Sequence, residues 1–159
     1  MSISSSQGGA GYELPLLLLA GFRAVIDEAH EELATRGHPE MRPVHGFAMQ
    51  AIGMSGATAA DVGRRRGVSK QAAGKTIEGL AELGYVQHAG ESADRRRKLV
   101  VLTPRGIEAL ALSALAFEHV RTRWAGLLGP GRVAALEADL RTVAPEQVFR
   151  LDIPGWLGS

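Results

Sequence analysis

The chain has 159 residues, of which 45% are hydrophobic, so it is long enough and apolar enough to fold around a core of its own. It contains no cysteine, which excludes a disulfide framework, a thiolate metal site and cysteine-based redox sensing. The net charge of +1 is unevenly distributed. Residues 58–106 hold ten lysines and arginines against five acidic residues, and the rest of the chain holds eight against twelve. A basic segment in an otherwise acidic chain is typical of a nucleic-acid-binding surface.

The first forty residues predict a polar start and one long helix. Residues 1–12 are small and polar, and we expect this segment to be disordered. The apolar run at 14–22 follows no positive charge and is too short to span a bilayer, so we expect neither an export signal nor a membrane anchor. Apolar spacings of three and four instead predict a helix from Pro15 to Arg36. Its first turns are apolar on all sides, which predicts that a second subunit covers them.

A short apolar helix ending near Ile52 is expected next, followed by a helix-turn-helix. Thr58 is the expected N-cap of the third helix, with Asp61 completing the cap. Gly67 supplies a left-handed residue for the turn, and Ser69 caps the fourth helix. The side of the fourth helix that we expect to face the core is apolar, at Ala73, Ile77, Leu80 and Leu83.

Two short β-rich runs, Tyr85–His88 and Leu99–Leu102, predict a hairpin with a long basic tip. Arginines on such a tip can enter a minor groove, whose narrow and negative interior attracts guanidinium groups. Asp94 is expected to orient one of them.

The remaining residues predict two helices and an apolar tail. Thr103 and Pro104 are suited to the N-cap and first position of a long fifth helix that ends at Gly129. A sixth helix is halted by Pro145, and we expect the tail that follows to pack on a partner chain or on the first helix.

The order of these elements resembles the MarR family of winged helix-turn-helix transcriptional regulators. Departures from the family pattern fall at Gly63, Arg66, Gly74 and Thr76. The matching residues are Thr58, Asp61, Val62, Gly67-Val68-Ser69-Lys70-Gln71-Ala72, Ile77, Leu80, Leu83-Gly84-Tyr85-Val86, Asp94-Arg95-Arg96 and Lys98-Leu99-Val100-Val101-Leu102-Thr103-Pro104-Arg105-Gly106.

The pattern and the resemblance together imply a mainly α fold with a small β-hairpin wing. After the segment 1–12, a helical dimerisation region at 13–42 and 104–159 would enclose a winged helix-turn-helix DNA-binding region at 43–103. The resemblance implies a homodimer that forms through the first, fifth and sixth helices and the C-terminal tail. Its two recognition helices would lie about one helical turn apart on a pseudo-palindromic operator in double-stranded DNA.

Hydroxyl, amide and ammonium groups on the outer face of the fourth helix can bond phosphates and base edges, and a glycine there lets the backbone approach. The resemblance places these groups in the major groove and the hairpin tip in the minor groove. The candidate DNA-binding residues are Thr58, Ser69, Lys70, Gln71, Ala72, Gly74, Lys75, Arg95, Arg96, Arg97 and Lys98.

The resemblance also implies a cleft between the first, second and fifth helices, where the family tends to hold small aromatic ligands. Every candidate for its lining also suits ordinary core or interface packing, which is the commoner role of such residues. Three histidines could approach one another there, but without a His-x3-His pair or a thiolate we expect no metal and no cofactor. The candidate lining residues are His30, His45, Phe47, Phe117 and Trp124.

The sequence has no GxSxG, P-loop or HExxH motif, so we expect no enzyme. We expect a cytoplasmic, dimeric, sequence-specific DNA-binding regulator, a repressor that is released by a small molecule or another signal. The alternative is a winged-helix module that binds another protein and has no sequence-specific affinity for DNA.

Overall fold

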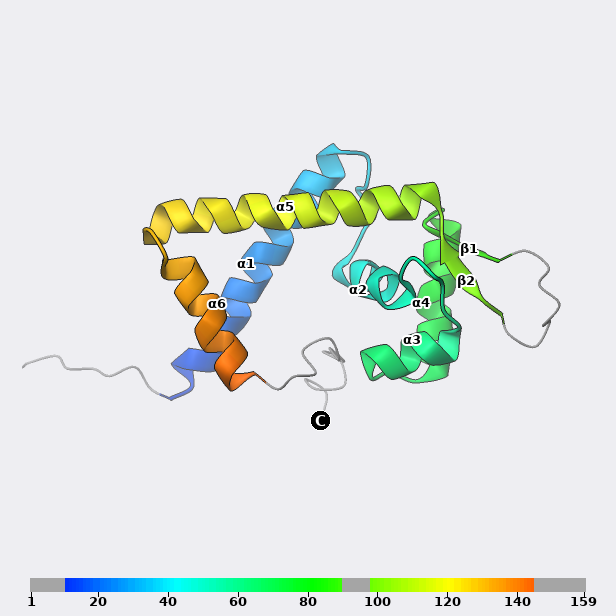
Figure 1. Cartoon of the computed structure of the whole chain (residues 1–159), viewed down its shortest axis with the longest axis horizontal. Helices are drawn as coiled ribbons and strands as arrows, with labels where there is room; N and C mark the ends of the chain where they lie inside the picture. Colours follow the sequence, from blue (N-terminus) through cyan, green and yellow to red (C-terminus); the bar gives the residue numbers. More distant parts are fainter. Residues whose placement is uncertain (1–10, 90–97, 145–159) are drawn as a thin grey trace, which may run out of the picture.

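The computed structural model describes residues 11–89 and 98–144. One long helix, α5, runs across the molecule; α1 crosses its middle, α6 lies towards one end of it, and α2, α3, α4 and a two-stranded hairpin lie towards the other end (Figure 1). The elements in chain order are α1 (Glu13–Thr35), α2 (Pro43–Ile52), α3 (Ala59–Arg66), α4 (Lys70–Glu82), β1 (Val86–His88), β2 (Val100–Leu102), α5 (Pro104–Leu128) and α6 (Arg132–Val143). Among the described residues, no helix combines the length and the apolar character needed to cross a membrane.

Helix α1 packs along α5 through a small apolar cluster around Ala29, Ala116 and Val120. Two polar contacts flank the cluster, an ion pair of Glu28 with Arg123 and a contact of Glu32 with Nδ1 of His119 at 3.0 Å. The helix begins at Glu13, two residues earlier than the predicted start at Pro15. Proline is tolerated there because the backbone N–H groups of the first turn have no partner within the helix.

The ends of the helix-turn-helix lie where the sequence predicts them. Thr58 Oγ1 accepts a hydrogen bond from Asp61 N at 3.2 Å, and Asp61 Oδ2 accepts one from Thr58 N at 3.0 Å. Gly67 has a φ of 70° at the turn, which is left-handed backbone that glycine adopts without strain. Ser69 Oγ accepts from Ala72 N at 3.0 Å. The predicted caps of α3 and α4 are therefore confirmed.

The hairpin strands β1 and β2 are antiparallel, with Gln87 opposite Val101, and each is one residue shorter than predicted. Ala57, just before α3, forms an isolated bridge with Val100, which fixes the start of β2 against the helix-turn-helix. The main core lies between the hairpin, the end of α1, α2, α3, α4 and the first half of α5. Its largest fully buried side chains include Tyr85, Leu33, Met49, Ile52 and Leu80.

The predicted fold class, mainly α with a small β-hairpin wing, is confirmed. The hairpin tip and the apolar tail beyond Pro145 lie outside the described residues.

Candidate nucleic-acid interface

The outer face of α4 forms a surface pocket of about 740 Å³. Five of the candidate DNA-binding residues line it together with Glu78, which the sequence reasoning did not single out: Ser69, Gln71, Ala72, Gly74 and Lys75. Lys70 is exposed on the same helix. The structure thus gathers the predicted polar, small and cationic side chains of the recognition helix on one surface.

Two features of this surface favour negatively charged partners. The backbone N–H groups in the first turn of α4 lie at the positive end of the helix dipole. The first turn of α4 carries Lys70 and no acidic residue, and Lys75 lies one turn further along. Glu78 is the one carboxylate in the pocket lining, and it could accept a hydrogen bond from a cytosine amino group or repel a phosphate.

The turn before α4 is closed by the backbone of Gly63. A Cβ at this position would lie 2.9 Å from the carbonyl oxygen of Val68 and 3.3 Å from the nitrogen of Lys70. These contacts leave no room for a side chain, so the departure from the family pattern at Gly63 lets α3 pack closely against the start of α4. The spacing of residues along the sequence carries no signal for such an approach.

Thr58 caps α3 in the structure, and its contact with DNA stays a prediction. Its hydroxyl donates to Asp61 Oδ2 at 2.8 Å and also accepts from the backbone of Asp61. The hydrogen bonds that the Asp61 carboxylate accepts from the Thr58 backbone N–H, from the Thr58 hydroxyl and from Arg64 lower the pKa of Asp61 from 3.8 to about 2. Asp61 is therefore ionised, and its charge is compensated within the helix-turn-helix.

Lys98 is exposed at the end of the hairpin that leads into β2. The three candidate arginines of the tip, Arg95, Arg96 and Arg97, lie outside the described residues, so their contact with DNA stays a prediction.

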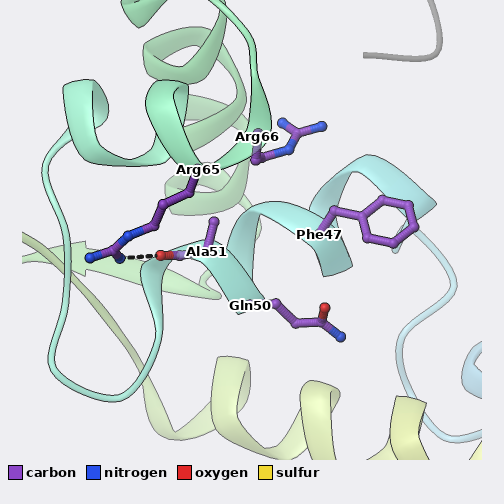
Figure 2. A pocket seen from close by; sticks show the side chains of 5 residues that line it. All are labelled: Phe47, Gln50, Ala51, Arg65 and Arg66. Atoms are coloured by element: carbon purple, nitrogen blue, oxygen red, sulfur yellow. Dashed lines mark hydrogen bonds between the residues drawn. The ribbon is translucent and has the colours of Figure 1, made fainter. Parts of the chain in front are cut away.

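The candidate ligand residues fall in two places. Phe117 and Trp124 pack on the α1–α5 cluster. Phe47 lies instead on α2, where it lines a pocket of about 260 Å³ with Gln50, Ala51, Arg65 and Arg66. Figure 2 shows the side chains of Phe47 and Arg66 extending on the same side of this pocket, whereas Arg65 turns back to the carbonyl oxygen of Ala51, to which it donates at 2.5 Å. Arg66, where the family pattern has an apolar residue, is only 7% exposed.

The two candidate histidines lie near each other on α1 and α2. The Nδ1 atom of His30 is 2.8 Å from the carbonyl oxygen of Ile26, and its buried Nε2 atom has no hydrogen-bond partner in the described part of the chain. Burial and the nearby charges of Arg42 and His30 lower the pKa of His45. Within residues 11–89 and 98–144, there is no group of three or more histidine, aspartate or glutamate side chains that could hold a metal ion.

The chain is similar to known proteins in both sequence and structure. Residues 41–97 match the model of the MarR family. No curated protein sequence matches the chain. Similar solved structures include Rv1404 from Mycobacterium tuberculosis, which has a TM-score of 0.66 and 16% identity and covers 87% of this chain and 95% of its own.

Two similar structures were solved with ligands. The MarR family protein Rv2887 from M. tuberculosis, in complex with salicylic acid, has a TM-score of 0.60 and 19% identity, over 89% of this chain and 100% of that one. A point mutant of MepR from S. aureus, bound to an oligodeoxyribonucleotide, has a TM-score of 0.58 and 14% identity, over 84% and 96%. At these identities the likeness shows a shared fold. The segment 41–97 of this chain is therefore similar to the MarR family, and the chain as a whole shares its fold with solved proteins that include a MarR family protein.

Proposed function

We propose that this protein is a dimeric, sequence-specific regulator of transcription that binds double-stranded DNA through α4 and the wing. The observation that supports this most strongly is the pocket on the outer face of α4, where five predicted contact residues lie together within the segment that matches the MarR family. MepR, which shares the fold, has been solved with an oligodeoxyribonucleotide.

The decisive experiment selects bound fragments from genomic DNA with the purified protein and then measures affinity for one selected duplex and its single-base variants. Gln71→Ala should cost about 1–3 kcal/mol at one base position and little elsewhere, because an amide that pairs with a base edge discriminates only there. A uniform loss on every sequence would show that Gln71 contacts the DNA backbone instead.

The salt dependence of DNA binding tests whether Lys75 contacts a phosphate. Lys75→Ala should lower the slope of log affinity against log salt by about one, since each phosphate contact releases about one counterion. Arg132→Ala removes the same charge at the start of α6, at the opposite end of α5 from α4 (Figure 1), and should leave the slope unchanged. If no selected duplex is bound above background, the protein-interaction module becomes the better account.

We further propose that two chains pair through the apolar ends of α1, α5 and α6. Leu17 is 61% exposed on α1, Leu127 is 71% exposed on α5, and Val143 is 78% exposed on α6. Apolar surface of this extent on neighbouring helices is typical of an interface. Further exposed apolar residues on these helices are Leu14, Leu16, Leu18, Leu19, Leu128, Leu136 and Leu140.

A charged residue introduced into this apolar surface tests whether two chains pair through it. Leu17→Glu should give a monomer by sedimentation and should weaken DNA binding, because a monomer contacts one half-site only. Met54→Glu, which places a charge at an exposed apolar residue between α2 and α3, should stay dimeric. A dimer with unchanged affinity in the Leu17 variant would exclude this interface.

A small aromatic acid is the candidate signal for release from DNA. The pocket at Phe47 offers an aromatic ring and cationic side chains, and Rv2887, which shares the fold, has been solved with salicylic acid. Salicylic acid itself is the probe: it should raise the dissociation constant for DNA, and Phe47→Ala and Phe117→Ala should show which of the two candidate places it occupies. An unchanged dissociation constant at saturating salicylate would exclude this class of signal.

A further inference from the structure

A buried joint ties the connector between α1 and α2 to the base of the wing. His38, in that connector, is 2% exposed, and Tyr85, directly before β1, is 1% exposed. Their side chains meet with His38 Nδ1 2.9 Å from the hydroxyl of Tyr85, and their ring centroids lie 5.6 Å apart. Forty-seven positions separate the two residues in sequence. The contact therefore links the helical region to the hairpin across the core.

Arg105, in the first turn of α5, packs against the pair formed by His38 and Tyr85. Its guanidinium carbon lies 5.0 Å from the centroid of the Tyr85 ring. Its Nε donates to the carbonyl oxygen of Leu83 at 3.3 Å, and its Nη2 donates to that of Gly37 at 3.2 Å. One side chain thus holds the end of α4 and the α1–α2 connector at once, while stacking on the residue between them.

The backbone of Tyr85 is equally constrained. Its nitrogen donates to Leu80 at 2.9 Å, and its carbonyl oxygen accepts from Thr103 N at 3.0 Å. A Cβ at Gly106 would lie 2.1 Å from that oxygen, so α5 touches the wing base backbone to backbone. Because Tyr85 precedes β1 directly, its position sets where the hairpin leaves the core.

The hydrogen bond within the joint depends on the charge of His38. Glu108 lies 3.9 Å from Nε2, which favours the proton on Nε2 and leaves Nδ1 to accept from the Tyr85 hydroxyl. Protonation would turn Nδ1 into a donor, so the hydroxyl would have to reverse. It would also bury a second cation near Arg105, with Glu108 as the opposing carboxylate.

We propose that His38, Tyr85 and Arg105 are positioning residues for the wing, and that protonation of His38 loosens this joint and weakens DNA binding in weakly acid solution. The proposal rests on the proposed function, and it adds a proton as a signal that acts away from the DNA-binding surface.

The direction of the effect follows from the surroundings of His38. Burial, and then the charge of Arg105, lower its pKa below 6.5, against the opposing effect of Glu108. The joint is therefore intact at neutral pH. Its contribution to stability declines as pH falls below 6.5, because the unfolded chain takes up the proton first. Burial raises the pKa of Tyr85, so its hydroxyl keeps the proton that it donates.

The test compares DNA affinity at about pH 7.5 and about pH 5.5, at constant ionic strength and on one selected duplex. His38→Asn keeps an acceptor near the Nδ1 position but does not titrate. The wild type should lose at least about fivefold more affinity than this variant between the two pH values. His119→Asn, which removes an exposed histidine paired with Glu32, should follow the wild type. Equal losses in the wild type and His38→Asn would overturn the proposal.

Two further measurements cover the remaining cases: Tyr85→Phe if the asparagine variant does not fold, and an NMR titration if no DNA is bound. Tyr85→Phe removes the hydroxyl and keeps the ring, so it should weaken binding at neutral pH and flatten the profile. In the full-length wild-type protein, NMR titration of the His38 imidazole should show the Tyr85 and β1 amides shifting with the same midpoint. If the chemical shifts of the β1 amides do not change as His38 titrates, the proposed coupling between His38 and the wing is wrong, whether or not the protein binds DNA.

Discussion

Thr58 and Asp61 hold the start of α3 by exchanging hydrogen bonds, each backbone nitrogen donating to the side chain of the other residue. Thr58→Ala removes the acceptor for Asp61 N and should lower the free energy of unfolding by about 1 kcal/mol, measured by urea denaturation. Thr58→Ser keeps the hydroxyl and should be close to the wild type. If the serine and alanine variants are equally destabilised, the methyl group rather than the cap is responsible.

The same pair predicts how stability responds to acid. The pKa of Asp61 is about 2 in the folded chain, below its ordinary 3.8, so its stabilising contribution is present above pH 3.8 and is lost as pH falls towards 2. Asp61→Asn does not titrate. Across this range of pH, the wild type should lose more stability than the variant in urea denaturation, and parallel curves would show that Asp61 is not linked to folding.

Substitution of Gly74 can separate the demands of folding from those of the proposed DNA binding. A Cβ at Gly74 would meet nothing within 4 Å, so the chain itself does not require glycine there. Gly74→Ala should raise the free energy of unfolding by about 1 kcal/mol, as alanine does within helices. It should also weaken DNA binding if the backbone approaches the groove at this point.

Gly79 is the matched control for that experiment, because it lies on the same helix with equally open surroundings and outside the pocket on α4. Gly79→Ala should stabilise the protein to a similar extent and leave DNA affinity unchanged. Unchanged affinity in both variants would remove Gly74 from the DNA-binding surface.

Gly63 should behave in the opposite way, although it too lies inside a helix. Gly63→Ala would force a methyl group against the backbone of Val68 and Lys70, and we expect a loss of about 1–3 kcal/mol in urea denaturation. Those neighbours are backbone atoms in a tight turn and have little room to move. A stabilised alanine variant would mean that the turn relaxes without cost.

The ends of the helices could be read from the sequence because each depends on one local side chain. Thr58, Ser69 and Thr103 each accept a backbone hydrogen bond from three residues ahead, and this spacing is visible in the chain itself. Gly67 is equally local, because left-handed backbone selects glycine.

The features that the sequence did not reveal depend on contacts between distant segments. His38 belongs to a connector that reads as polar, yet Tyr85 and Arg105 enclose it. Phe47 and Phe117 both suit an aromatic pocket by composition, but they lie in different places because Phe47 packs beside the end of α3. Arg66 stands where the family pattern has an apolar residue, and the structure shows that it is buried there.

Helix α5 is unbroken over 25 residues, from the base of the wing to the turn before α6. At a rise of 1.5 Å per residue it is a stiff rod of about 37 Å, and a tilt of about 5° at one end would displace the other by about 3 Å. In the proposed dimer, a change in the contact between two chains at the α6 end would therefore produce a larger displacement at the end that carries the proposed DNA-binding surface. A rigid helix of this length transmits such a displacement without any change in the side-chain contacts along it.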